Sequence, residues 1–151
     1  YLRFFSPSCT FSNALSPVQA AVIAKAFDIV GSAEGDALRA KLMGNVLNLR
    51  NSLAAHGLEV YGDPSAIVCV KMGSEGLARL VSRRLPELGL IANLVEYPAV
   101  PKAQARFRMQ VMAGHTEENI AAAVQRLVKG RGIAVAEMEA MAEPMPLAAV
   151  A

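Results

Sequence analysis

The chain has 151 residues, of which 54% are hydrophobic and 19% are charged. This composition argues against disorder, and the length suits one compact domain with a sizeable core, or one domain plus a helical extension. The formal net charge of +2 comes without a run of lysine or arginine, which argues against a nucleic-acid partner. Charged residues interrupt the apolar stretches, so the sequence predicts no transmembrane segment.

The two cysteines and two histidines carry little functional signal. Cys9 and Cys69 lie in apolar surroundings, which predicts buried, reduced thiols in a cytoplasmic protein. His56 and His115 have no Cys or carboxylate at metal-ligand spacing, so we expect no metal site. No targeting segment is visible, and the chain begins at Tyr1 inside an apolar run. We therefore expect a domain cut from a longer protein.

The first third of the chain predicts helices. Residues 6–13 are rich in Ser, Thr and Asn and favour turns. Pro17 suits the first position of a helix, which Gly31 interrupts. A second helix follows as far as His56, where Gly57 is a suitable C-cap. The apolar stripes of these two helices are Val18, Val22, Ala26, Ile29 and Val30, and then Leu38, Leu42, Val46, Leu49 and Leu53.

The pattern then becomes mixed. The short β-branched run 66–72 predicts a buried strand, and Ser74 can cap a helix as far as about Leu85. Residues 90–97 predict a second strand, stopped by two prolines, Pro98 and Pro101.

The last predicted strand, 106–112, alternates in character. Phe107, Met109 and Val111 are on one face, and Arg106, Arg108 and Gln110 are on the other. Thr116 caps a final helix with Ile120, Val124, Leu127 and Val128 facing the core. The predicted fold class is α/β: a two-layer sandwich of a small sheet with helices on one face, preceded by a long helical arm.

Two segments carry residues that could bind a ligand. Residues 11–17 (FSNALSP) place hydroxyl and amide groups before a helix, where free N–H groups and the helix dipole can bind an anion. The alternative is an ordinary N-cap loop. Residues 97–118 carry Arg106 and Arg108 on one face of a strand, and such a pair could grip a carboxylate. The alternative there is a solvated edge strand. The sequence holds no phosphate-binding glycine loop and no signature of a Ser or Cys nucleophile.

Both segments resemble motifs of the α-oxoamine synthases. Residues 11–17 resemble their F-[ST]-[NT]-[AS]-L-x-P motif. Residues 100–110 (VPKAQARFRMQ) and 114–120 (GHTEENI) are similar to the family's C-terminal V-P-x-G-x-A-R-x-R and A-H-T-x-E-x-I runs. The motifs occur in the family's order, and the likeness covers about residues 1–130. The Ser-Asn pair most resembles the glycine C-acetyltransferase branch of a group that includes 8-amino-7-oxononanoate synthase and serine palmitoyltransferase.

The resemblance implies an enzyme of fold type I, related to class I and II aminotransferases, that condenses an amino acid with an acyl-CoA on pyridoxal 5′-phosphate. It assigns the substrate carboxylate to Arg108. Arg106 is a second candidate, for which we expect a structural or interface role. Ser12 and Asn13 match the position that contacts the cofactor phosphate across a homodimer. His115 matches a family histidine, for which we expect a capping role.

Two departures from the family pattern matter. Lys25 lies in an Ala-Lys-Ala-Phe context that imitates the cofactor lysine motif, but it follows the 11–17 motif and falls in a helical stripe. We expect it to be an exposed helical lysine, so this chain holds no catalytic residue and should be inactive alone. Ala103 stands where the family has Gly, so the turn before the arginine strand is expected to differ.

The resemblance also implies a domain organisation. Residues 1–56 would be the end of the cofactor domain with connecting helices, 57–132 a small C-terminal α/β domain, and 133–151 a weakly ordered tail. Two alternatives remain open: a class I or II aminotransferase domain, and a free-standing α/β interaction module whose arginine face docks an acidic partner.

Overall fold

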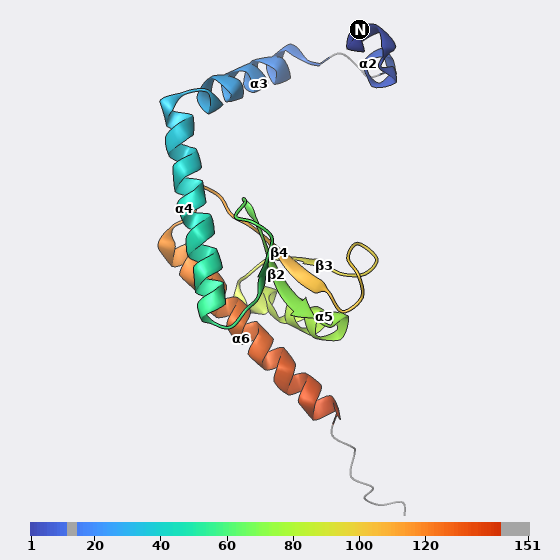
Figure 1. Ribbon diagram of the computed structural model, residues 1–151, viewed down its shortest axis with the longest axis vertical. Coiled ribbons are helices and arrows are strands. Elements are labelled where there is room, and N and C mark those ends of the chain that lie inside the picture. The colour runs from blue at the N-terminus through green and yellow to red at the C-terminus, as the bar shows by residue number, and fades with distance from the viewer. Residues whose placement is uncertain (12–14, 143–151) are drawn as a thin grey trace, which may run out of the picture. The chain divides into compact units, whose positions relative to one another are not determined.

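The computed structural model describes residues 1–11 and 15–142 and contains two compact units. The first unit is Tyr1–Leu38 and the second begins at Arg39. Helix α4 (Ala33–Ala55) runs through the boundary between them (Figure 1). None of the helices in the described ranges combines the length and apolar character that crossing a membrane requires.

The described part of the first unit contains α1 (Leu2–Phe5), α2 (Pro7–Phe11), α3 (Pro17–Val30) and the beginning of α4. The predicted start of α3 is confirmed. Ser16 and Gln19 form a capping box in which each side chain accepts a hydrogen bond from the other's backbone N–H. The short helices α1 and α2 were not predicted. No side chain of α3 is buried, so its apolar stripe is exposed in this chain.

The prediction of two buried thiols is wrong for one cysteine. Cys9 lies in α2 and is exposed, because this helix belongs to a unit whose large apolar side chains are themselves exposed. Cys69 is half-buried, and both thiols are free.

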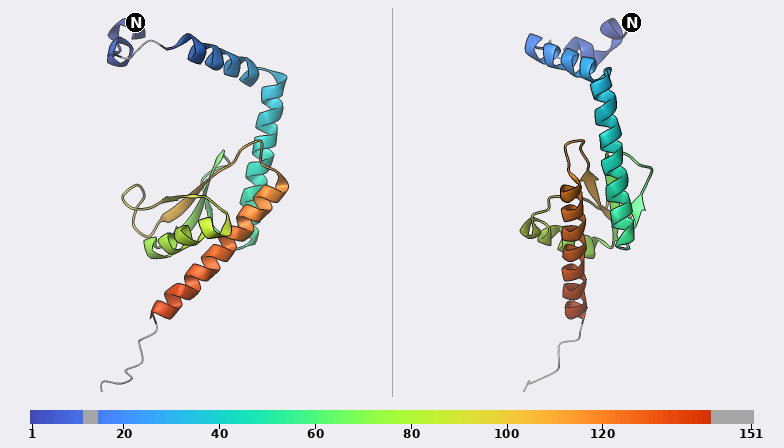
Figure 2. Two further views of the ribbon diagram at one scale, coloured as in Figure 1. Left: turned by 180° about the vertical axis from the view of Figure 1, so that it is seen from behind. Right: turned by 90° about the vertical axis from the view of Figure 1, so that its left-hand side faces the viewer.

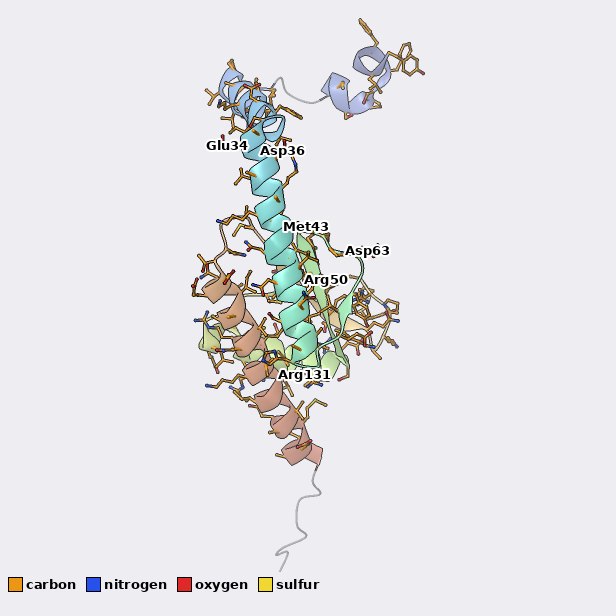
Figure 3. All side chains as sticks on the ribbon, turned by 60° about the vertical axis from the view of Figure 1, so that its left-hand side comes forward. Glu34, Asp36, Met43, Arg50, Asp63 and Arg131 are labelled. Carbon is orange, nitrogen blue, oxygen red and sulfur yellow. The ribbon has the colours of Figure 1, made fainter. Side chains whose placement is uncertain are left out.

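Helix α4 follows the interruption predicted at Gly31 and supplies part of the core of the second unit. Val46, Leu49 and Leu53 are buried on one stripe of the helix. Gly57 then adopts a φ of +72°, as expected for a C-cap. Arg50, labelled in Figure 3, donates hydrogen bonds from α4 to the carbonyl oxygens of Tyr61 and Gly62, at 3.3 Å and 2.6 Å. These bonds fix the first strand against the helix.

The second unit contains a four-stranded antiparallel sheet in the order β1-β2-β4-β3. Its strands are β1 (Val60–Tyr61), β2 (Ile67–Gly73), β3 (Asn93–Val95) and β4 (Ala105–Gln110). Strand β1 was not predicted, and β3 is much shorter than the predicted 90–97. Strand β4 pairs with β2 on one side and β3 on the other, so the edge-strand alternative for the arginine segment is wrong.

One face of this sheet is buried and the other is open. Val68 and Val70 of β2 and Phe107 and Met109 of β4 join a single apolar core with α4, α5 (Glu75–Arg84) and α6 (Glu117–Ala142). Helices α5 and α6 pack against each other (Figure 2). A short 3₁₀ helix, η1 (Pro86–Leu88), links α5 to the segment before β3. The predicted two-layer α/β sandwich with helices on one face is confirmed.

Helix α6 begins where predicted but ends much later. Thr116 and Asn119 cap its first turn through reciprocal hydrogen bonds at 3.1 and 3.2 Å. The helix then continues to Ala142, into the segment predicted to be weakly ordered. Two contacts explain the extension, because Ala134 is completely buried and Glu137 pairs with Arg84 of α5. The rest of that segment, 143–151, lies outside the described residues.

Two glycines in α6 offer a matched test of the packing between α5 and α6. A Cβ at Gly132 would meet no atom within 4 Å, whereas a Cβ at Gly130 would lie 3.0 Å from Leu85 and 3.4 Å from Leu88. Because Gly disfavours a helix interior by about 1 kcal/mol relative to Ala, Gly132→Ala should stabilise the chain by about that amount. Gly130→Ala should gain less or lose stability. Urea denaturation of the two variants measures the difference, and equal gains would contradict this packing.

Candidate functional site

The arginine face of β4 lies on the open side of the sheet. Alternation along the strand buries Ala105, Phe107 and Met109 and leaves Arg106 and Arg108 on the opposite face, as predicted. Arg108 is directly opposite Cys69 of β2 and Asn93 of β3. The two arginines therefore share a face, but their surroundings differ.

Arg106 is held by neighbours on its own face. Its Nε donates to the Gln104 carbonyl oxygen at 3.1 Å, and its Nη2 donates to Gln104 Oε1 at 3.2 Å. The guanidinium carbon also lies 4.4 Å from the ring centroid of Tyr61, on β1. Lys71, whose pKa is raised by its hydrogen bond with Glu59, lies 5.7 Å from the same ring. These contacts support the structural role expected for Arg106.

Arg108 is free. Its side chain is exposed and makes no hydrogen bond, ion pair or ring contact with any described residue. It lines a groove of about 750 Å³ at the end of β4, between the start of α6 and the residues that lead into β3. A guanidinium without a protein partner keeps its fork of N–H donors available for a carboxylate.

The groove around Arg108 is mostly apolar, and its described lining residues carry no negative charge. Its described polar lining residues are Asn93, Arg108, Gln110, His115, Asn119 and Arg126. Arg126 is partly engaged, because its Nη1 donates to the Gly89 carbonyl oxygen at 3.0 Å. Neither a carboxylate nor a lysine is among the described lining residues. The groove can therefore attract an anion but cannot itself supply an amine to a cofactor.

One buried amide holds the rim of this groove. Asn45 of α4 is 9% exposed, and its Nδ2 donates to the carbonyl oxygens of Met112 and His115, both at 3.0 Å. Within the same turn, His115 Nδ1 accepts a hydrogen bond from the Met112 N–H at 3.3 Å. The capping role expected for His115 agrees with this contact. Asn45 was missed, although a polar residue on the apolar stripe between Leu42 and Leu49 was a visible signal.

The other predicted residues divide into two groups. Ser12 and Asn13, assigned by resemblance to the cofactor phosphate, lie outside the described residues. Lys25 is exposed on α3, which confirms the expectation of a helical surface lysine. Within the described residues, no group of His, Cys, Asp and Glu could hold a metal ion.

The turn before β4 keeps a glycine-like conformation despite Ala103. This residue adopts a φ of 59°, in the left-handed region that Gly enters without a steric penalty. Its backbone N–H donates to Glu75 Oε1 at 2.9 Å. The chain therefore departs from the family pattern in the identity of this residue, whereas its backbone has a conformation that Gly would favour.

Comparison with known proteins places this chain in a family. The profile of the family described as aminotransferase class I and II matches residues 1–127. The 2-amino-3-ketobutyrate coenzyme A ligase of Escherichia coli K12 is 35% identical over 129 residues, covering 85% of this chain and 32% of the relative. The 8-amino-7-oxononanoate synthase of Dechloromonas aromatica is 36% identical over 127 residues, covering 84% and 32%.

Solved structures give the same fold. A Sphingomonas wittichii serine palmitoyltransferase matches with a TM-score of 0.81 at 24% identity, covering 89% of this chain and 34% of its own. An 8-amino-7-oxononanoate synthase from Francisella tularensis matches with a TM-score of 0.69 at 23% identity, covering 92% and 38%. The chain thus spans about a third of the length of the relatives it matches. It belongs to the aminotransferase class I and II family.

Proposed function

We propose that this chain is the substrate-gripping C-terminal part of a pyridoxal-phosphate-dependent acyltransferase that condenses an amino acid with an acyl-CoA to an α-oxoamine. The observation that carries the proposal is the free guanidinium of Arg108 in a groove whose described lining residues include no carboxylate. Relatives named as a coenzyme A ligase and as a synthase support an acyltransferase over an aminotransferase.

Arg108 would bind the amino-acid carboxylate through two parallel hydrogen bonds. A bidentate contact fixes the direction of the carboxylate and so restricts rotation of the adjoining Cα. Apolar side chains line part of the groove beside this contact and would strengthen it by lowering the local dielectric. Arg106 would take no direct part, because Gln104 and Tyr61 already hold its side chain.

Pyridoxal phosphate would supply the electron sink for chemistry at that Cα. A serine palmitoyltransferase with a similar fold carries this cofactor in a solved structure. Ser12 and Asn13 have the hydroxyl and amide groups that could contact its phosphate across a homodimer. The lysine that holds the cofactor would come from outside this chain, so the chain alone should be inactive.

The remaining assignments belong to the same proposal. The protein would be a cytoplasmic homodimer, with residues 1–56 completing the cofactor domain. Residues 57–132 would form the small C-terminal domain, and 133–151 would follow it as a tail of which α6 takes the first part.

The ligand offers a direct test in the intact enzyme. Supplied with an amino acid and an acyl-CoA, the enzyme should release CoA, whereas supplied with an amino acid and a keto acid it should transfer no amino group. The matching amine without a carboxylate should bind about a hundredfold more weakly than the amino acid, since it loses a charged bidentate contact. Amino transfer without CoA release would favour the aminotransferase alternative. Equal binding of amine and amino acid would contradict the role of Arg108.

A further inference from the structure

One face of helix α5 binds both ends of the loop that leads into β4. Glu75 and Arg79 are one helical turn apart and therefore lie on the same side of α5. Arg79 forms a bidentate pair with Glu96, at the start of the loop. Its Nε donates to Oε2 at 2.9 Å and to Oε1 at 3.2 Å, and its Nη2 donates to Oε1 at 2.9 Å. Glu75 accepts the N–H of Ala103, at the end of the loop, at 2.9 Å.

The contact at Glu75 supports a backbone conformation that Ala103 does not favour. An L-residue with a side chain disfavours the left-handed region, in which the φ of 59° places Ala103. In that conformation the Ala103 N–H points to the Glu75 carboxylate, which makes the hydrogen bond charge-assisted. The acceptor thus offsets a local cost that a glycine at this position would not have.

The ladder between β2 and β4 is irregular at the beginning of β4, where β3 still pairs with the strand through Val95 and Arg106. The ladder with β2 shifts register between Lys71 and Gly73, opposite Arg106 and Ala105. Such an irregularity removes ladder hydrogen bonds and changes the local twist. Because the β2 ladder is irregular there, contacts outside the sheet add to the pairing with β3 in fixing how β4 enters, and the loop end held by Glu75 is the adjoining contact.

The residues that follow Ala103 determine the positions of the Arg106 and Arg108 side chains. Gln104, next to Ala103, holds Arg106 through its carbonyl and side-chain oxygens. Arg108 follows two residues later on the same face, free and at the groove. A rotation at Ala103 would displace Gln104, release Arg106 and move the start of the strand that carries Arg108.

We infer that Glu75 and Arg79 are positioning residues: they hold loop 96–104 at both ends so that Arg106 is retained and Arg108 is presented to the substrate carboxylate. This inference rests on the proposed function. Neither residue lines the groove, so both act through the backbone of the loop and not by touching the substrate.

The first experiment is a substitution cycle read out by amino-acid affinity in the intact enzyme. Glu75→Ala should weaken amino-acid binding about tenfold, because small displacements of a gripping group are costly. Glu75→Gln keeps an oxygen acceptor and should retain most of the affinity. Ala103→Gly in the Glu75→Ala background should restore it, because Gly needs no support for a positive φ. Glu139→Ala, which removes an exposed carboxylate from α6 beyond the residues that line the groove, is the control and should change nothing.

A merely structural Glu75 would behave differently. If it only stabilised the N-terminus of α5, Gly at position 103 would not restore the affinity, and that result would overturn the inference. Arg79→Ala should weaken binding in the same direction as Glu75→Ala, and its effect should not be restored by Ala103→Gly.

The second experiment needs no substrate and uses this 151-residue chain. The ¹⁵Nε resonance of Arg108 should shift in Glu75→Ala and return in the double variant with Ala103→Gly, and an unmoved resonance would overturn the inference. The chemical shift of the Ala103 amide should follow the titration of the Glu75 carboxyl. The pKa of that carboxyl is lowered first by its own backbone N–H and then by that of Ala103, and Arg79 and Lys102 face it. If Arg108→Ala leaves amino-acid affinity unchanged, the proposed function fails, while the Arg108 resonance still decides the positioning role.

Discussion

In the intact enzyme, Arg108→Ala should lower amino-acid affinity by about 2–3 kcal/mol, roughly a hundredfold, and leave the cofactor bound. The reason is that the substitution removes the free guanidinium from the groove and leaves a carboxylate with no charged donor. Titration with the amino acid measures the loss, and absorbance of the bound cofactor measures its retention.

A positive charge without the guanidinium fork should not give the full amino-acid affinity of the wild type. Arg108→Lys keeps the positive charge but loses the planar fork, so we expect affinity between those of the wild type and Arg108→Ala. Arg83→Ala removes an exposed arginine of α5 that does not line the groove, and it should have no effect. An equal loss in Arg83→Ala would point to a diffuse electrostatic effect and contradict a specific grip.

Arg108→Ala should hardly change the free energy of unfolding. Because Arg108 contacts no described residue through its charged group, Arg108→Ala should change the free energy of unfolding by less than about 0.5 kcal/mol. A large loss of stability would mean that the side chain has a structural partner and would weaken its assignment to the substrate.

The strand that carries the site was predictable because its signal is local. Alternation from Ala105 to Gln110 fixes which side chains share a face, and the period of two leaves one answer once Phe107 is buried. The starts of α3 and α6 were predictable for a similar reason, since Pro17 suits a first helical position and Thr116 acts on a residue only three positions away.

The different roles of Arg106, which is held by its neighbours, and Arg108, which is free at the groove, could not be predicted from spacing. Arg106 and Arg108 have equivalent positions in the alternating pattern, and what separates them is Tyr61, on a two-residue strand with no sequence signal of its own. The length of α6 depends likewise on Arg84 and the burial of Ala134 in the core. Contacts between distant segments, not local propensity, set both features.

Asn45 is a polar residue near the site whose replacement should cost substantial stability. Its Nδ2 supplies both hydrogen bonds to the carbonyls of Met112 and His115 from a buried position. Asn45→Ala should lose about 2 kcal/mol, and Asn45→Asp about 3 kcal/mol at neutral pH, because a carboxylate has no proton to donate to either carbonyl. Urea denaturation of this chain measures both values. Asn51→Asp, at an exposed position of the same helix, is the matched control and should be nearly neutral.

The cost of Asn45→Asp should depend on pH with a definite sign. Burial and the two carbonyls raise the pKa of the introduced carboxyl in the folded chain above its unfolded value of about 3.9, since only the protonated form can donate. The folded state then binds more protons than the unfolded state as pH rises above that value, so stability falls with increasing pH. Below about 3.9 the variant should approach Asn45→Ala or exceed it in stability. A difference between these two variants that stays constant with pH would mean that the turn at Met112 and His115 opens to water, and that Asn45 does not hold the rim of the groove.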